Sequence, residues 1–392
     1  MPYLVRVLLP ENFGVVIFAQ SLMACFVVFV NYGFDWSATR KIAVSRTDPR
    51  TVSRIAANVW ASKALLCLAG LVLLIVLMHL LPDLNRISRL LLVLYGIPVG
   101  NLLFPSWLFL GMERMALIAV INFIMRLLTT AGVFLFLRSP EDYMLYALLL
   151  SFQWVGAGAT GAIVGYKACG LMFVFPSWKE VAQVLGEGWT LFLSTGAISL
   201  YTAGNAFILG LLTDASTVGY YGAAEKLVSA GRGLLSPLTQ AVYPRFSKLA
   251  GESKAKALFW ARKVLFLMTG VGLALSTAFF LGAPIVVRVI LGPDYGPSVN
   301  VLRILAVLPT MVAISNVLGI QIMVPFRYER PFLGFLVLAG LINLVLALLL
   351  APAWKAPGMA VAVAISESFV TLAFFLYSWA IGLNPLRRSL GS

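Results

Sequence analysis

The chain has little charge, one histidine and few cysteines. Charged residues make up 11% of its 392 residues, against 61% apolar ones. A water-soluble protein could not cover its surface with so little charge. The only histidine, His79, and the widely separated Cys25, Cys67 and Cys169 have no zinc-binding or redox spacing, and they leave no basis for a Ser-His-Asp triad. We therefore expect neither a metal nor a cofactor.

Long apolar runs fill most of the sequence, which predicts an all-α polytopic protein of the lipid bilayer. A crossing needs about twenty apolar residues. By this rule eleven segments are long enough to cross: 13–34, 58–81, 89–110, 115–137, 143–166, 188–211, 217–243, 264–282, 298–322, 333–352 and 357–381. The net charge of +14 comes from loops between these segments, which indicates membrane topology and excludes a nucleic-acid partner.

Loop charges predict the orientation. Lysine and arginine are concentrated in the loops after the first, third, fifth, seventh and ninth segments and in the tail, so these are predicted to be cytoplasmic. The C-terminus is then inside and, with eleven segments, the N-terminus is outside. A twelfth helix before Met1 would make the number even, so the chain is predicted to start late or to be a truncated form.

The two halves of the chain resemble each other. Leu8–Gly14 (LLPENFG) and Leu211–Gly219 (LLTDASTVG) each enter an apolar segment that ends in a basic loop, Arg40–Arg54 or Arg245–Lys263. Repeated halves are a recurrent transporter plan. We expect two pseudo-symmetric lobes, 1–170 and 188–392. Residues 171–187 between them carry apolar side chains at helical spacing, which predicts an amphipathic linker helix.

Several charged residues fall inside the apolar segments. Each costs about 2.5–3.5 kcal/mol on insertion scales, so such residues usually face a wet cavity or a partner. Arg126, near the middle of 115–137, is expected either to contact a substrate phosphate or to pair with a carboxylate such as Glu367. Lys226 and Arg232 lie in the segment 217–243, and Lys63 lies one turn inside 58–81, where it either extends to the surface or faces the cavity.

The acidic and amide residues of the apolar segments add further candidates. Glu225 and Arg232 share a helix face but are separated by about 10 Å of helix rise. Glu225 is therefore expected to neutralise a cation on another helix or to couple transport to a proton or sodium ion, a role also open to Glu367. Gln153, Asn205 and Asn316 lie near mid-segment. They either bond across packed helices or contact a sugar.

Several stretches resemble one family, including Leu291–Ala306 and Gln321–Phe332. Pro2–Ser21 (PYLVRVLLPENFGVVIFAQS), Asn31–Ala43 (NYGFDWSATRKIA) and above all Val218–Leu249 (VGYYGAAEKLVSAGRGLLSPLTQAVYPRFSKL) resemble the oligosaccharide flippases of polysaccharide biosynthesis, the Wzx-type O-antigen translocases. The resemblance implies the twelve-helix fold of the multidrug/oligosaccharidyl-lipid/polysaccharide (MOP) exporter superfamily. Compared with this pattern, we expect the first family helix to be missing from this chain.

The resemblance also implies a substrate and a location. An undecaprenyl-pyrophosphate-linked oligosaccharide, such as an O-antigen repeat unit, would be flipped across the inner membrane by alternating access, with a glycan polymerase as a partner. By analogy, Arg126, Arg232, Lys226 and Lys63 would bind the pyrophosphate headgroup. Such a protein breaks no bond and is a transporter, not an enzyme.

Two alternatives remain open. A drug or cation antiporter of the same superfamily should have unpaired carboxylates in its cavity, and Glu225 and Glu367 are the main candidates here. A membrane enzyme acting on lipid-linked glycans, a polymerase or ligase, would need sizeable outward loops. The predicted outward loops are short.

Overall fold

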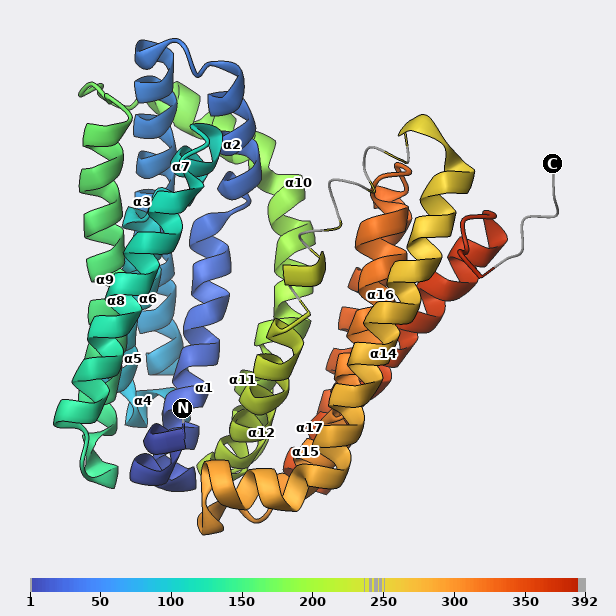
Figure 1. Ribbon diagram of the computed structural model, residues 1–392. Coiled ribbons are helices and arrows are strands. Elements are labelled where there is room, and N and C mark those ends of the chain that lie inside the picture. The colour runs from blue at the N-terminus through green and yellow to red at the C-terminus, as the bar shows by residue number, and fades with distance from the viewer. Residues whose placement is uncertain are drawn as a thin grey trace. The chain divides into compact units, whose positions relative to one another are not determined.

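A computed structural model describes residues 2–386 except 236, 240, 241, 243–245, 247, 248 and 250. The regular elements of this part of the chain are all helices, and it contains no strand (Figure 1). Eight stretches are long and apolar enough to cross a membrane: Pro2–Val44, Pro49–Leu80, Ser88–Gly111, Met115–Phe136, Pro140–Ala168, Lys254–Leu291, Ser298–Met323 and Glu329–Ala380. The chain is therefore a multi-pass membrane protein.

The eight stretches differ from the eleven expected segments in two places. The last stretch is two helices joined at Lys355, where φ is 51° and ψ is −132°, and it covers the expected segments 333–352 and 357–381. The expected segment 217–243 reaches beyond the described residues, as do many of the side chains in 188–211. Within the described ranges, the expected segments 188–211 and 217–243 are not among the eight stretches.

The chain divides into two compact units. The first, here called the N-terminal unit, is Val15–Phe207; the second, the C-terminal unit, combines Met1–Gly14 with Ile208–Ser392. The two units meet in sequence at Phe207 and Ile208, whereas the lobe boundaries expected at 170 and 187 stay a prediction. Helix α1 (Pro2–Asn31) is interrupted at Leu9, with φ 59°, just before Pro10, and its residues up to Gly14 belong to the C-terminal unit.

The N-terminal unit holds most of α1 and the next nine helices. These are α2 (Phe34–Val44), α3 (Pro49–Leu80), α4 (Pro82–Arg86), α5 (Ser88–Leu94), α6 (Gly96–Leu103), α7 (Ser106–Gly111), α8 (Met115–Phe136), α9 (Tyr143–Ala168) and α10 (Trp178–Ala203). A β-carbon added to Gly100 of α6 would lie 2.3 Å from the backbone of Trp154 in α9. Glycine thus permits close packing of these two helices.

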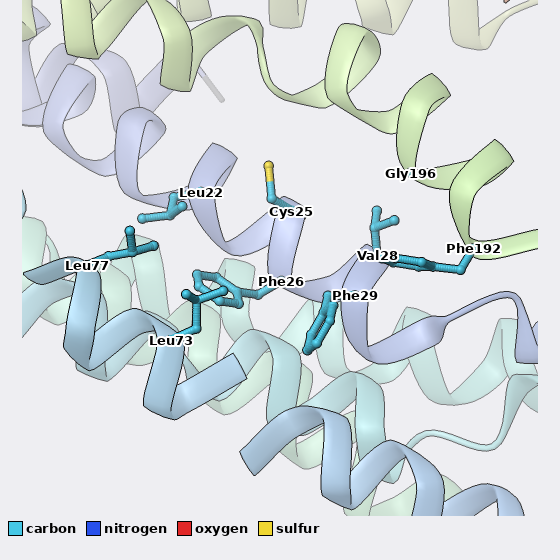
Figure 2. Close-up of a pocket in the computed structure, with 9 residues that line it drawn as sticks. All are labelled: Leu22, Cys25, Phe26, Val28, Phe29, Leu73, Leu77, Phe192 and Gly196. Carbon is cyan, nitrogen blue, oxygen red and sulfur yellow. The ribbon is translucent and has the colours of Figure 1, made fainter. Parts of the chain in front are cut away.

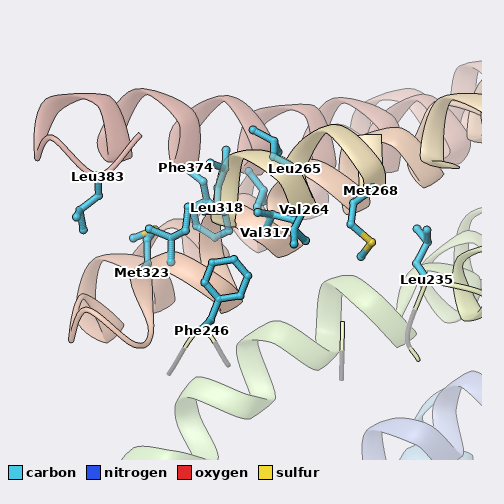
Figure 3. Packing of buried hydrophobic residues seen from close by; sticks show 14 of the residues in the cluster. Leu235, Phe246, Val264, Leu265, Met268, Val317, Leu318, Met323, Phe374 and Leu383 are labelled. Atoms are coloured by element: carbon cyan, nitrogen blue, oxygen red, sulfur yellow. The ribbon is translucent and has the colours of Figure 1, made fainter. Parts of the chain in front are cut away.

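The C-terminal unit contains the remaining elements. These are α11 (Asn205–Leu212, which begins at the end of the other unit), α12 (Ala215–Gly233), α14 (Lys254–Val286), η2 (Val287–Leu291), η3 (Pro293–Tyr295), α15 (Ser298–Leu305), α16 (Leu308–Asn316), η4 (Val317–Met323) and α17 (Glu329–Ala380). Its core joins Leu265 and Met268 of α14 to Val317 and Leu318 of η4 and Phe374 of α17 (Figure 3). This core holds the helix that carries Glu367.

Two expected connections prove to be helical. The amphipathic segment begins at Trp178 and continues without a break into the rest of α10, while the part described just before it, 171–177, has no regular structure. The basic region before Lys263 is helical from Lys254, because the Ser253 hydroxyl accepts a hydrogen bond from the Lys256 backbone N–H at 3.4 Å and caps α14. Arg245 and Lys248 of this predicted loop lie outside the described residues.

The two similar segments of the halves make reciprocal contacts. A β-carbon added to Gly14 would lie 1.8 Å from the carbonyl oxygen of Ala215, and one added to Gly219 would lie 2.0 Å from that of Pro10. Gly219 follows Gly14 by the same number of residues as Ala215 follows Pro10. The two contacts are therefore related: each glycine lies against a carbonyl of the other segment. Backbones can approach this closely only where the residue has no β-carbon.

Candidate functional site

Helix α12 carries an ion pair within a unit of membrane-spanning helices. The Arg232 Nη2 atom lies 3.3 Å from the Glu225 Oε1 atom, and the two side chains are 27% and 34% exposed. Both residues lie on one face, two turns apart, and their long side chains close the gap along the axis. The expectation that Glu225 neutralises a cation on another helix is therefore wrong in this structure.

A second carboxylate is attracted to the same arginine. Glu367 of α17 interacts attractively with the charge of Arg232, and α12 packs against α17. Arg232 therefore pairs with Glu225 and attracts a second carboxylate, although no ion pair within 4 Å joins it to Glu367 in the described part of the chain. We call Glu225, Arg232 and Glu367 the acidic pair with its arginine. Its two carboxylates are candidates to take up a cation, a proton included.

Lys226 attracts the neighbouring Glu225 carboxylate, but its ammonium also lies over an aromatic ring. Its Nζ atom lies 5.2 Å from the centroid of the Phe13 ring, and that ring in turn meets Tyr295 edge to face at 6.4 Å. An ammonium over an aromatic face gains about 0.5–2 kcal/mol, more when water is excluded. Lys226 thus joins the opening residues of the chain to α12.

Lys63 is enclosed in the core of the N-terminal unit. It is 1% exposed, so it does not extend to the surface, and its Nζ donates a hydrogen bond of 2.9 Å to the carbonyl oxygen of Asn101. Asp35 attracts this ammonium group and accepts a hydrogen bond of 2.6 Å from the Ser106 hydroxyl. In this structure Lys63 is inaccessible to a ligand.

Proline explains why a lysine is needed there. In a helix the Asn101 carbonyl would accept from the N–H four residues later, but that residue is Pro105, which has no N–H. An unpaired carbonyl in a low-dielectric interior costs several kcal/mol. The ammonium of Lys63 satisfies this acceptor. Sequence reasoning missed Asp35, Asn101 and Ser106, although the spacing of Asn101 and Pro105 was a usable signal.

Arg126 lies on the exposed side of α8. The helix packs through Ile121, Thr129 and Gly132, whereas Arg126 is exposed, like the neighbouring Phe123 at 67%. It forms no ion pair within 4 Å among the described residues of the chain. Each end of α8 is about 15 Å away along the axis, too far for the guanidinium to reach either surface easily.

The amide candidates differ in burial. Gln153 of α9 is half-buried and Asn205, at the start of α11, is buried. Asn316 of α16 is half-buried, and its Oδ1 atom has no hydrogen-bond partner in the described part of the structure. Asn316 therefore has an acceptor that a hydroxyl group could use.

An apolar groove that the sequence analysis did not identify lies in the N-terminal unit (Figure 2). It has a volume of about 290 Å³ and lies between α1, α3 and α10; its lining residues are Leu22, Cys25, Phe26, Val28, Phe29, Leu73, Leu77, Phe192 and Gly196. The Cys25 thiol is the only polar side-chain group among them. A groove of this kind suits a hydrocarbon chain.

Comparison with known proteins places the chain in a family and a fold. The family model described as "Polysaccharide biosynthesis protein" matches residues 1–250. The chain is 34% identical over 376 residues, or 96% of its length, to a protein of Escherichia coli (strain K12) named "Putative O-antigen transporter", of which it covers 91%.

Solved structures share the fold at low identity. An inward-facing multidrug resistance MATE family transporter of the MOP superfamily matches with a TM-score of 0.72 and 15% identity, over 100% of this chain and 94% of that one. The lipid II flippase MurJ, in an inward closed conformation, matches with a TM-score of 0.67 and 14% identity over 94% and 85%.

These matches confirm the expected resemblance and the MOP-type, MATE-like fold. They also confirm the expectation of a transporter rather than an enzyme, because the relatives and structural neighbours given above are transporters or flippases by name. The family model covers more than half of the chain. The chain belongs to the polysaccharide biosynthesis protein family.

Proposed function

We propose that the chain flips a polyprenyl-pyrophosphate-linked oligosaccharide across the inner membrane of a bacterium by alternating access. The observation that carries this proposal is Arg126, an exposed arginine at the centre of a membrane-length helix. Against hydrocarbon such a charge costs about 2.5–3.5 kcal/mol on insertion scales. Facing a cavity that receives a pyrophosphate, its planar fork gains paired, charge-assisted hydrogen bonds instead.

The other parts of the substrate also have complementary groups. The apolar groove of Figure 2 has room for part of a polyprenyl chain. Gln153, Asn205 and Asn316 are the candidates for sugar hydroxyls, and Asn316 has an unused acceptor. The E. coli relative, named for O-antigen transport, supports a glycan of this class.

The four cations have different roles in this proposal. Arg126 is the headgroup ligand. Arg232 is already paired with Glu225, so it joins the headgroup only when that pair opens. Lys226 and Lys63, held by Phe13 and by the Asn101 carbonyl, contribute positive potential and position helices rather than contacting phosphate directly.

The acidic pair with its arginine is the proposed coupling site. Glu225 pairs with Arg232 and Glu367 is attracted to it, so H⁺ or Na⁺ bound at either carboxylate would weaken its attraction to Arg232 and change how α12 packs against α17. Eleven crossings in two pseudo-symmetric lobes, with the C-terminus in the cytoplasm, complete the proposal. The kink at Lys355 and the reciprocal glycine contacts support it.

A second candidate is a cation or drug antiporter. The two carboxylates Glu225 and Glu367 and the fold of the MATE transporter support it. An antiporter would confer drug resistance that depends on the carboxylates and not on Arg126. A flippase would depend on Arg126 whatever drug is present.

Complementation separates the two candidates. The chain is expressed in a bacterium that lacks its flippase and makes a matched glycan, with Arg126→Ala, Arg126→Lys and, as a surface control, Arg86→Ala, whose side chain is 80% exposed. We expect surface glycan from the wild type and the control, loss with Arg126→Ala and partial recovery with Arg126→Lys. Full glycan from correctly inserted Arg126→Ala protein would reject Arg126 as the headgroup ligand.

A further inference from the structure

A small hollow lies beside the first turns of α3 in the N-terminal unit. Its volume is about 360 Å³, and its lining residues are Arg50, Thr51, Arg54, Met172, Phe173 and Val174. One wall therefore carries two guanidinium groups and a hydroxyl, and the opposite wall is apolar. Sites of this size and mixed lining are typical for small amphiphilic ligands.

The apolar wall is held in place by hydrogen bonds to α3. The Met172 N–H donates to the Ser53 hydroxyl at 2.9 Å, and the Ser177 N–H donates to the Asn58 Oδ1 at 2.9 Å. The Asn58 amide also donates to Glu180. These bonds fix the irregular segment 171–177 along the helix, so the wall keeps its shape without regular structure.

The same segment presents aromatic rings outward. Phe173 and Phe175 are 76% and 81% exposed, and they meet edge to face with ring centroids 5.0 Å apart. Two fixed, exposed phenyl rings are costly in water and favourable against lipid. They suit the polar–apolar boundary of a bilayer.

The acids nearby leave positive charge available. Asp48 is occupied with capping α3, because it accepts bonds from the backbone N–H groups of Arg50 and Thr51 and from the Thr51 hydroxyl. The Glu180 Oε2 atom lies 3.8 Å from the Nε atom of Arg54. The two terminal amino groups of that guanidinium therefore stay available for a phosphate. Arg50 forms no ion pair within 4 Å in the described part of the chain.

The position of the hollow in the sequence places it at the membrane boundary. One membrane-length stretch begins at Pro49, so that Arg50 and Arg54 lie in its first turns, and another ends at Ala168, shortly before Met172. We propose that this hollow binds the phosphate headgroup of an anionic phospholipid, with Arg50 and Arg54 on the phosphate and an acyl chain against Phe173. The basic loops on this side are those that the positive-inside rule assigns to the cytoplasm. The proposal does not depend on the transported substrate.

Lipid binding to the delipidated full-length protein in detergent tests the proposal. Native mass spectrometry would measure the Kd for dioleoylphosphatidylglycerol and, separately, for dioleoylphosphatidylcholine. Since each basic residue near anionic lipid contributes about 1 kcal/mol, Arg50→Gln and Arg54→Gln should each raise the Kd for phosphatidylglycerol about fivefold. Together they should raise it about 25-fold, and the Kd for phosphatidylcholine should not change.

Two controls make the result specific. Arg86→Gln removes an exposed arginine outside the hollow and should leave the Kd unchanged, and the melting temperature of each variant shows that it is folded. Phe173→Ser should weaken the binding of phosphatidylglycerol but not the binding of soluble glycerol phosphate. Equal affinities for the two lipids, or an unchanged Kd in the double variant, would overturn the proposal. Glycerol phosphate binding as tightly as the lipid would reassign the hollow to a soluble phosphate.

Discussion

The Nζ atom of Lys63 lies 2.9 Å from the carbonyl oxygen of Asn101, which Pro105 leaves without a helical donor. The lysine is 1% exposed. Its ammonium group donates the hydrogen bond that a backbone N–H at position 105 would otherwise donate to this carbonyl. Lys63, which the sequence suggested as a substrate ligand, therefore has a structural role at the break between α6 and α7.

Replacing Lys63 tests this explanation. Lys63→Met should destabilise the protein by about 1–3 kcal/mol because it leaves a buried carbonyl unpaired. In a Pro105→Ala background the residue at 105 regains an N–H, so the same substitution should cost clearly less. Thermal unfolding in detergent would measure both arms of this double-mutant cycle. Equal costs in the two backgrounds would mean that Lys63 does not act through this carbonyl.

Removing Arg232 should be worse than removing either of its partners. Arg232→Met leaves Glu225 without its ion-pair partner and removes the cation that attracts Glu367, and we expect a loss of about 1–3 kcal/mol, reduced from fully buried values because the pair is partly exposed. In Arg232→Met with Glu225→Gln and Glu367→Gln, most of this loss should be recovered. Melting temperatures of the single and triple variants provide the measurement; a triple variant no more stable than Arg232→Met would contradict the arrangement.

The reciprocal glycines should not tolerate a β-carbon. Gly219→Ala places a methyl group 2.0 Å from the Pro10 carbonyl oxygen, and overpacking of this kind costs about 1–3 kcal/mol. Gly233→Ala, on the same helix with nothing within 4 Å of the added atom, is the matched control and should be neutral or slightly stabilising. If the two variants melt at the same temperature, the close crossing is not present in the membrane-extracted protein.

Asp214, just before α12, should make stability depend on pH. Burial raises the pKa of Asp214, but hydrogen bonds from Thr217 and the charge of Lys355 outweigh it and hold the pKa below its usual range. A carboxylate with a lowered pKa stabilises the fold above its ordinary pKa and loses this effect as the pH falls through the folded value.

Two substitutions of Asp214 distinguish the contribution of its helix cap to stability from the contribution of its charge. Asp214→Ala should cost about 1 kcal/mol at neutral pH through loss of the cap, whereas Asp214→Asn keeps a capping oxygen and should cost less. The difference in melting temperature between the wild type and Asp214→Asn should shrink as the pH is lowered from neutrality toward about 3, below the ordinary aspartate pKa. A difference that stays constant with pH would exclude a contribution from the charge.

The sequence predicted the helical membrane class well because apolar length alone determines it. It also predicted that Lys226 and Arg232 point in different directions, since helix geometry is regular. It did not predict the ion pair of Glu225 and Arg232, because the rise along the helix gives the separation of the backbones and not the reach of the side chains. It did not predict that Lys63 is buried, because the carbonyl that it binds belongs to a helix nearly forty residues away. The apolar groove was missed for the same reason: its lining comes from three helices.

The contacts at Gly14 and Gly219 are arranged like those of a two-fold symmetric dimer. A β-carbon on Gly14 would meet the Ala215 carbonyl oxygen, and one on Gly219 would meet the Pro10 carbonyl oxygen. In an isologous dimer, two copies of one segment exchange contacts in this way across a two-fold axis. Here both segments belong to one chain, so the crossing does not depend on protein concentration, as the crossing of a dimer would.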